Sequence, residues 1–328
     1  MQEINKEITD MYGIEIKSIV PFKDASLVTC DKGRKVLKKT DLTPDRILFI
    51  HEAKEHLIKN NFSNIDRYLC TLEGEPYVTI GENRYYIIDF VEGRECNFDS
   101  KADTAKAAAM LGAFHKATKG FVQPHGSRSK DDLGKLPCYF VKRLDEIKKL
   151  KKIAKRGKSR FDYLFLQYVD YFYALGENSI SSLASSKYSE LVENTRSQGI
   201  FCHHDYTHNN IIFNESGTWV INFDYCCFEL KIYDIANLIR RKMRKCYWNV
   251  DDAKTIIEEY RRVEDICNDE IHVMKIMLQF PQKFWRVANK YYNSRRSWSE
   301  KSYVSRLQEV IDELEHHKKF MESYDSIF

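Results

Sequence analysis

The residues best suited to chemistry lie in a short polar segment, where His203, Asp205 and Asn210 form the pattern H-x-D-x-x-x-x-N. Phosphoryl transfer from ATP needs an aspartate that accepts the proton of the substrate hydroxyl and an asparagine oxygen that holds Mg²⁺. The histidine of such a loop packs behind it and fixes its shape. The pattern therefore predicts Asp205 as the catalytic base, Asn210 as a metal ligand and His203 as the anchor of the loop.

A second metal ligand is expected shortly after this loop. Two apolar segments, 211–213 and 218–223, flank the turn 214–217 and predict a β-hairpin. The hairpin would return the chain to the same site, where residues 221–225 read Ile-Asn-Phe-Asp-Tyr. Carboxylate and amide oxygens suit a hard cation such as Mg²⁺. Asn222 and Asp224 are therefore further candidate metal ligands.

Two other interpretations of the segment remain open at this point. A His-x-Asp pair is common in ordinary turns, because both residues form turns and caps readily. A zinc site is also conceivable, since cysteine, histidine and aspartate crowd together at Cys202, His203, His204, Asp205 and His208. The segment lacks a second ligand pair at the spacing of zinc fingers, and it has no H-E-x-x-H pattern. The order of the elements that follow favours the phosphoryl-transfer interpretation.

The elements that would position these residues begin with a β-rich region. Alternation and turn residues predict strands at 14–21, 26–30, 35–38, 77–80 and 84–91. One helix is expected between the third and fourth of these strands, with Thr43 as its N-cap and Pro44 at its first position. The helix should end at Asn60-Asn61. The first ninety or so residues thus predict a small five-stranded sheet with one helix.

The rest of the chain is predominantly helical. Apolar residues three and four apart predict helices at 101–119, 138–156, 160–178, 187–198, 234–246, 252–262, 270–293 with a break at Pro281, and 299–322. The aromatic stripe from Phe161 to Tyr173 is typical of helix packing. The change of pattern lies near Glu92-Gly93. We therefore expect an N-terminal lobe at 1–92 and a helical C-terminal lobe at 93–328, with a cleft between them.

Composition limits the function classes. The chain has 328 residues, 43% of them hydrophobic, and a formal net charge of +4, which is too small to argue for nucleic-acid binding. A basic run at 148–160 is more typical of a solvated helix face than of a polyanion site. No window is apolar enough to span a membrane, and the charged start does not resemble a secretory signal. Nine cysteines without a C-x-x-C pair suggest reduced thiols and a cytoplasmic protein.

Five segments together carry a resemblance to a known family: 35–38, 86–95, 111–116, 203–210 and 280–292. The chain resembles the aminoglycoside phosphotransferase and choline kinase superfamily, and within it the CotS-type spore coat proteins. The resemblance implies an α+β, bilobal, protein-kinase-like fold with a small nucleotide-binding lobe and a large helical lobe that carries the catalytic loop. It also implies ATP and Mg²⁺ as cofactors and a small-molecule hydroxyl as acceptor.

The resemblance assigns the nucleotide site to the first lobe. Lys38 matches the third-strand lysine that holds the α- and β-phosphates, and its partner would be Glu52 or Glu55 on the following helix. The segment 88–91, with Asp89 and Val91, matches the hinge whose backbone pairs with adenine. In the second lobe, Asp234 matches an acid that braces the catalytic loop.

Two departures from the family pattern leave an alternative open. Asn222 stands where active relatives usually carry the principal metal-binding aspartate, and the turn 21–26 has no glycine for close approach to phosphates. The alternative is a catalytically impaired pseudokinase that acts as a structural or scaffold component of the spore coat. In both interpretations we expect a protein of the mother-cell cytoplasm that ends in the coat, with other coat proteins as partners.

Overall fold

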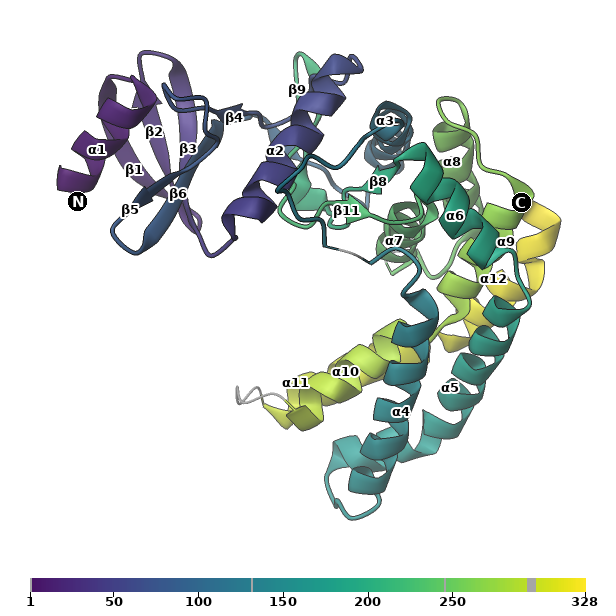
Figure 1. Cartoon of the computed structure of the whole chain (residues 1–328). Coiled ribbons are helices and arrows are strands. Elements are labelled where there is room, and N and C mark those ends of the chain that lie inside the picture. The colour runs from purple at the N-terminus through teal and green to yellow at the C-terminus, as the bar shows by residue number, and fades with distance from the viewer. Residues whose placement is uncertain (1, 131, 245, 294–298) are drawn as a thin grey trace. The chain divides into compact units, whose positions relative to one another are not determined.

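The computed structural model describes residues 2–130, 132–244, 246–293 and 299–328, with the side chains of residues 2–5 left out of the description (Figure 1). The chain folds into two compact units. The sheet unit comprises Met1–Asn97, Met110–Asp131 and Gln198–Phe228, and the helical unit comprises Phe98–Ala109, Asp132–Ser197 and Glu229–Phe328. The chain thus passes between the units several times, and the expected lobe boundary at residue 92 stays a prediction.

The sheet unit is built on an antiparallel sheet. Its strands lie in the order β1 (Ile16–Phe22), β2 (Ala25–Cys30), β3 (Gly33–Thr40), β6 (Asn83–Asp89) and β4 (Tyr68–Leu69), and β5 (Val78–Ile80) also pairs with β6. The two-residue β4 is one strand more than expected, because so short a strand has no alternation to detect. Pairing of β3 with β6 places Lys38 opposite Tyr86 and Lys35 opposite Asp89.

Two helices accompany this sheet. The expected helix is α2 (Pro44–Lys59), and it buries Ile47, Ile50 and Leu57 as its period predicts. The other helix, α1 (Gln2–Tyr12), was not predicted. Ile8 and Tyr12, one turn apart on α1, are fully buried and pack in the core formed with the strands. Figure 1 shows α1 against the purple sheet.

The segments around the predicted catalytic residues form a second group of strands in the same unit. β7 (Arg94–Glu95), β9 (Ile211–Asn214) and β10 (Gly217–Val220) form one sheet, and β8 (Phe201–Cys202) pairs with β11 (Cys227–Phe228). Gly93 has φ +155°, and a Cβ there would lie 2.5 Å from the Phe213 carbonyl oxygen, so glycine lets β7 approach β9. The hairpin β9–β10 confirms the expected turn, but β10 ends at Val220 and not at residue 223.

The remaining helices follow the predicted order. They are α3 (Lys101–Thr118), which passes from the helical unit into the sheet unit, and α4 (Leu136–Ala154), α5 (Arg160–Ala184), α6 (Tyr188–Gln198), α7 (Ile232–Met243), α8 (Val250–Arg261), α9 (Asn268–Gln279), α10 (Gln282–Asn293), α11 (Glu300–Asp312) and α12 (Leu314–Ile327). The break at Pro281 is confirmed. The helix expected at 299–322 is two helices that meet at Glu313.

Aromatic packing holds α5 in the helical unit. Phe161, Phe165 and Phe172 belong to one buried core with Phe284 and Leu307, which confirms the packing interpretation of this stripe. The ring centroids of Phe172 and Phe284 are 4.2 Å apart in a stacked arrangement. Among the described helices, none combines the length and the apolar character that crossing a membrane requires.

Candidate active site

The predicted catalytic residues lie together in the sheet unit. The segment between β8 and β9 turns through the 3₁₀-helix η1 (His208–Asn210). The Asn210 side-chain amide donates to the backbone oxygen of Asp205 at 2.9 Å and to its Oδ2 at 2.9 Å. Asn210 is buried, whereas Asp205 is half-buried. Asn210, from the end of the same short loop, thus helps to fix the Asp205 carboxylate.

His203 is fully buried behind this loop. Its Nε2 lies 3.0 Å from the Ile221 carbonyl oxygen, and its Nδ1 accepts the Asp205 N–H at 3.3 Å. The ring packs edge-on against Phe223, with centroids 4.9 Å apart. Both ring nitrogens therefore have backbone partners, which suits the anchoring role and leaves no lone pair for the zinc alternative at this residue.

Asn222 lies beside Asn210. It lies two residues after the end of β10 and has a φ of +66°, in the left-handed region. The Asn222 side-chain amide donates to Oδ1 of Asn210 at 3.3 Å. Its backbone N–H donates to Oδ2 of Asp66 at 2.9 Å. Two of the three candidate metal ligands are thus neighbours, joined by an amide-to-amide hydrogen bond.

The Asp66 carboxylate that binds the Asn222 backbone also forms a buried ion pair. Lys54 Nζ lies 2.9 Å from Asp66 Oδ1, and the two side chains are 2% and 3% exposed. Lys54 also donates to the Asp66 carbonyl oxygen at 2.6 Å and lies over the ring of Phe223. The sequence interpretation missed this pair. The sequence offers one sign that Lys54 is buried, because this lysine interrupts the apolar stripe of α2. Asp66 lies in a loop that carries no motif.

The third candidate ligand, Asp224, contacts Lys38. Lys38 Nζ lies 2.7 Å from Asp224 Oδ2, and each side chain is about one-fifth exposed, 22% and 21% respectively. The Tyr86 hydroxyl donates to Asp224 Oδ1 at 3.2 Å. Burial raises the pKa of Tyr86, and the Asp224 carboxylate raises it further. The phosphate-binding candidate and an acidic metal-ligand candidate therefore form one ion pair at the edge of the site.

Arg46, near the start of α2, is a further neighbour of this strand end that the sequence interpretation missed. Its Nη2 donates to the Asp224 carbonyl oxygen at 3.0 Å and also to the Cys226 carbonyl oxygen. Burial raises the pKa of the Cys226 thiol to about 11, so this cysteine behaves as a small apolar residue, as expected. Arg46 and Lys54, one from each half of α2, thus hold the segment 222–226.

The other predicted nucleotide-site residues lie on the same sheet and helix. Glu52 is half-buried on α2 and Glu55 binds Arg67 through two hydrogen bonds of 2.8 and 2.6 Å. Within the described residues, neither glutamate contacts Lys38. Asp89, at the end of β6, pairs with Lys35 at 2.5 Å, and Val91 follows two residues after the end of β6. Their roles toward a nucleotide stay predictions.

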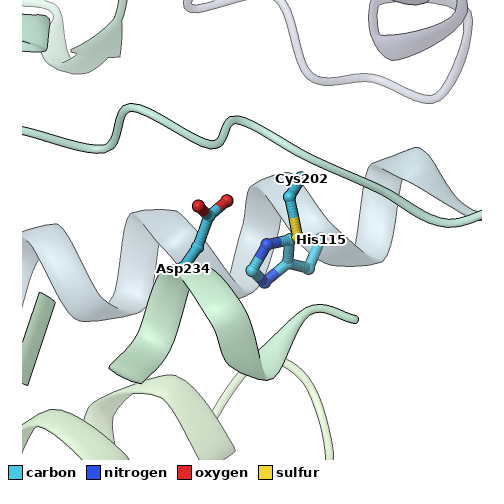
Figure 2. A group of neighbouring side chains, drawn as sticks. All are labelled: His115, Cys202 and Asp234. Carbon is cyan, nitrogen blue, oxygen red and sulfur yellow. The ribbon is translucent and has the colours of Figure 1, made fainter. Parts of the chain in front are cut away.

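Two further polar side chains of the sheet unit are fully buried. His115 on α3 and Cys202 on β8 are 0% exposed, and their ligand atoms lie within 4.8 Å of each other (Figure 2). Phe114, the neighbour of His115, packs against Phe201. Asp234, which Figure 2 also labels, belongs to α7 of the helical unit.

The chemistry of the donor set fits a hard divalent cation. Asn210, Asn222 and Asp224 offer only oxygen ligands of the kind that Mg²⁺ binds. Asp224 is the one carboxylate among these three, so the set carries less negative charge than two aspartates would provide. The set therefore fits Mg²⁺ in ligand type, and the reduced charge predicts weaker binding.

The chain is similar to known spore coat proteins over nearly its whole length. The family model described as "Spore coat putative kinase YutH" matches residues 5–324. Spore coat protein S of Bacillus subtilis strain 168 is 26% identical over 335 residues, which cover 100% of this chain and 95% of that protein.

Solved structures share the fold. An aminoglycoside phosphotransferase from Alicyclobacillus acidocaldarius superposes with a TM-score of 0.85 at 24% identity, over 95% of this chain and 92% of that chain. Spectinomycin phosphotransferase, solved with ADP and spectinomycin, gives a TM-score of 0.58 at 15% identity, over 98% and 93% of the two chains. The fold is thus the expected α+β kinase-like fold.

Proposed function

The chain belongs to the family described as "Spore coat putative kinase YutH", and from this premise we propose that it is a phosphotransferase of the spore coat. The proposed reaction moves the γ-phosphoryl group of ATP to a hydroxyl of a small molecule, with Mg²⁺ as cofactor. Solved neighbours of the same fold include a protein bound to ADP and spectinomycin and one bound to AMP-PNP, Ca²⁺ and its substrate. Those ligands support the class of the reaction and leave the acceptor open.

One observation carries the proposal. Asp205, Asn210 and Asn222 form a continuous chain of hydrogen bonds of 2.9 and 3.3 Å within one compact unit, and the Lys38–Asp224 ion pair lies in the same unit. A general base, amide oxygens and a lysine on a strand are the parts that phosphoryl transfer requires of a protein. An ordinary turn with a His-x-Asp pair would not need all of them.

The chain's own residues would divide the work as follows. Asp205 accepts the proton of the acceptor hydroxyl as its oxygen attacks phosphorus, and Asn210 holds that carboxylate in place. Lys38 binds phosphate oxygens. Before the nucleotide binds, the ion pair with Asp224 holds the Lys38 ammonium group at the site. Mg²⁺, when bound by Asn210 with Asp224 or Asn222, would neutralise phosphate charge.

Turnover of ATP by Asp205→Asn tests this assignment. The substitution keeps the shape of the side chain and removes the base, so ATP consumption should fall by about 10²–10⁴-fold. Asp10→Asn, on an exposed position of α1, is the matched control and should consume ATP at the wild-type rate. Unchanged consumption in Asp205→Asn would remove this residue from the proposed role.

A specific observation favours a second candidate, an impaired pseudokinase with a structural role in the coat. The Asn222 amide donates to Oδ1 of Asn210, the atom that a metal would use, and it brings no charge. Asn222→Asp separates the candidates. If only the missing charge limits the site, this variant should bind Mg²⁺·ATP about tenfold tighter or better and consume it faster. The structural role is favoured if the wild type is inactive and Asn222→Asp neither binds nor consumes more ATP than the wild type does.

Family membership supports a place in the spore coat with other coat proteins as partners. Fractionation of spores with an antibody to the chain tests this part separately from the chemistry. Recovery in the coat extract is expected, and recovery in the core fraction alone would contradict it.

A further inference from the structure

A pocket inside the helical unit has a charge pattern that the proposed reaction does not use. It lies where the C-terminal part of α7 meets α5, α12 and the junction between α9 and α10, and its volume is about 100 Å³. That volume admits several water-sized groups, since one water needs at least about 10–15 Å³. All of its lining residues belong to the helical unit, so the pocket can be described without reference to the catalytic loop.

We name it the basic pocket because five cationic side chains line it: Arg240, Arg241, Arg244, Lys283 and Arg286. Glu313 is the one carboxylate among its lining residues. Lys283 Nζ lies 2.9 Å from Glu313 Oε1, so this carboxylate is already used. Within residues 2–130, 132–244, 246–293 and 299–328, no ion pair reaches Arg240, Arg244 or Arg286. The lining of the pocket therefore holds more cations than carboxylates, and three of its arginines have no ion-pair partner among the described residues.

The excess is not explained by the end of α7 alone. Cations near a helix C-terminus interact favourably with the helix dipole, worth about 0.3–1 kcal/mol each, and this accounts for Arg240, Arg241 and Arg244 in part. Lys283 and Arg286 come from the first turns of α10, where the dipole disfavours cations. Two helix ends of opposite polarity thus contribute cations to the same cavity.

Arg240 is held in position for binding. Its Nη2 donates to the Met277 carbonyl oxygen, and its Nη1 donates to Asn237 Oδ1 at 3.2 Å. Burial, together with the neighbouring charges of Arg286 and Arg244, lowers the pKa of Arg240 to about 10. Like charges in a partly buried place are costly unless an anion compensates them.

The inner wall of the pocket is apolar and aromatic. Phe172, Phe280, Phe284 and Trp248 line it. Trp248 packs edge-on against His317, with ring centroids 4.4 Å apart. His317 is itself bound to the Leu278 carbonyl oxygen at 3.1 Å, and burial lowers its pKa to about 4. His317 is therefore neutral at pH 7 and belongs to the apolar wall.

An arginine-lined mouth above an aromatic wall matches one class of ligand. Planar guanidinium groups bind phosphate and carboxylate in a bidentate manner, and aromatic walls bind an apolar body. We propose that the basic pocket binds a small organic anion, a phosphate or carboxylate carried on an aromatic or apolar body. This inference does not depend on the proposed function, because none of its residues takes part in the reaction as proposed.

Titration of the full chain with phenyl phosphate, benzoate and benzylamine tests the inference. Trp248 fluorescence, with Trp248→Phe to assign the signal, and the melting temperature report binding. We expect one or both anions to bind, and the anion that binds more tightly identifies the headgroup. Benzylamine has a similar body and the opposite charge, so it should not bind.

Arg244→Gln and Arg286→Gln should each weaken binding of the anion about tenfold or more, because each removes a charge-assisted contact. Both arginines are exposed at the pocket mouth, so the variants should fold, which their melting without ligand checks. Arg156→Gln, on an exposed position after α4, is the matched control and should bind as the wild type does. Failure of both anions to bind at millimolar concentration would overturn the inference, as would equal binding by the wild type and both pocket variants.

Discussion

In the sheet unit, the two lysines near the candidate site are each paired with a carboxylate, whereas the basic pocket of the helical unit gathers five cations around one carboxylate that Lys283 already binds. Lys38 pairs with Asp224, and Lys54 pairs with Asp66. The difference indicates that charged side chains have different roles in the two units. Paired charges hold the segment 222–226 in shape, and the clustered cations of the basic pocket are those for which we propose an anionic ligand.

The largest effect is expected where a pair is most deeply buried. Lys54→Met leaves the Asp66 carboxylate without its cation in a buried place, so the free energy of unfolding should fall by about 3–5 kcal/mol. Denaturant unfolding measures this loss. Lys59→Met, on an exposed position at the end of the same helix, is the control and should change stability by no more than about 0.5 kcal/mol. A loss below 1 kcal/mol in Lys54→Met would contradict the structural role of the pair.

A second effect follows from the neutral histidine of the basic pocket. Burial, with a smaller contribution from the charge of Arg240, lowers the pKa of His317 to about 4 from an ordinary value of 6.5. Between these two pH values the unfolded chain binds a proton that the folded chain does not, so stability falls as the pH falls through this window. The loss is at most about 3 kcal/mol, because one pKa unit is worth about 1.4 kcal/mol.

Denaturant unfolding at pH 7, 5.5 and 4.5 checks this dependence. His317→Gln keeps a donor for the Leu278 carbonyl oxygen and removes the titration, so its stability should fall less over the same range. Parallel curves for the wild type and the variant would show that His317 is not the group concerned.

The smallest effect has the opposite sign. Arg286→Gln removes one of several like charges at the pocket mouth, so the protein without ligand should become more stable by about 0.2–0.5 kcal/mol. Calorimetry at low ionic strength measures the gain, and 1 M salt should abolish it, because salt screens exposed charges. A destabilised variant at low salt would mean that Arg286 has a partner within the chain.

Local patterns were enough to predict that the candidate catalytic residues lie close together. His203, Asp205 and Asn210 lie within eight consecutive positions, and the hairpin that follows is marked by its turn, so short-range spacing placed them together. The order of helices and the break at Pro281 followed for the same reason, since period and proline act locally.

Pairings between distant segments could not be predicted. Asp66 meets Lys54 and Asn222 only through the packing of α2 against its neighbours, and nothing in its own segment marks it. Lys38 was expected beside a helix glutamate, and its carboxylate in the structure is Asp224, far along the chain. The basic pocket likewise combines residues of α7 and α10, and each group alone is typical of a solvated helix face.

The thermal shift caused by nucleotide tests the central claim most directly. A protein that binds Mg²⁺·ATP gains about 2.7 kcal/mol of stability when the ligand is at one hundred times its Kd. We predict a higher melting temperature with millimolar ATP and Mg²⁺ for the wild type and for Asp205→Asn, and a much smaller shift for Lys38→Met, which loses the phosphate-binding cation. An unchanged melting temperature of the wild type at millimolar ATP and Mg²⁺ would contradict the proposed phosphotransferase.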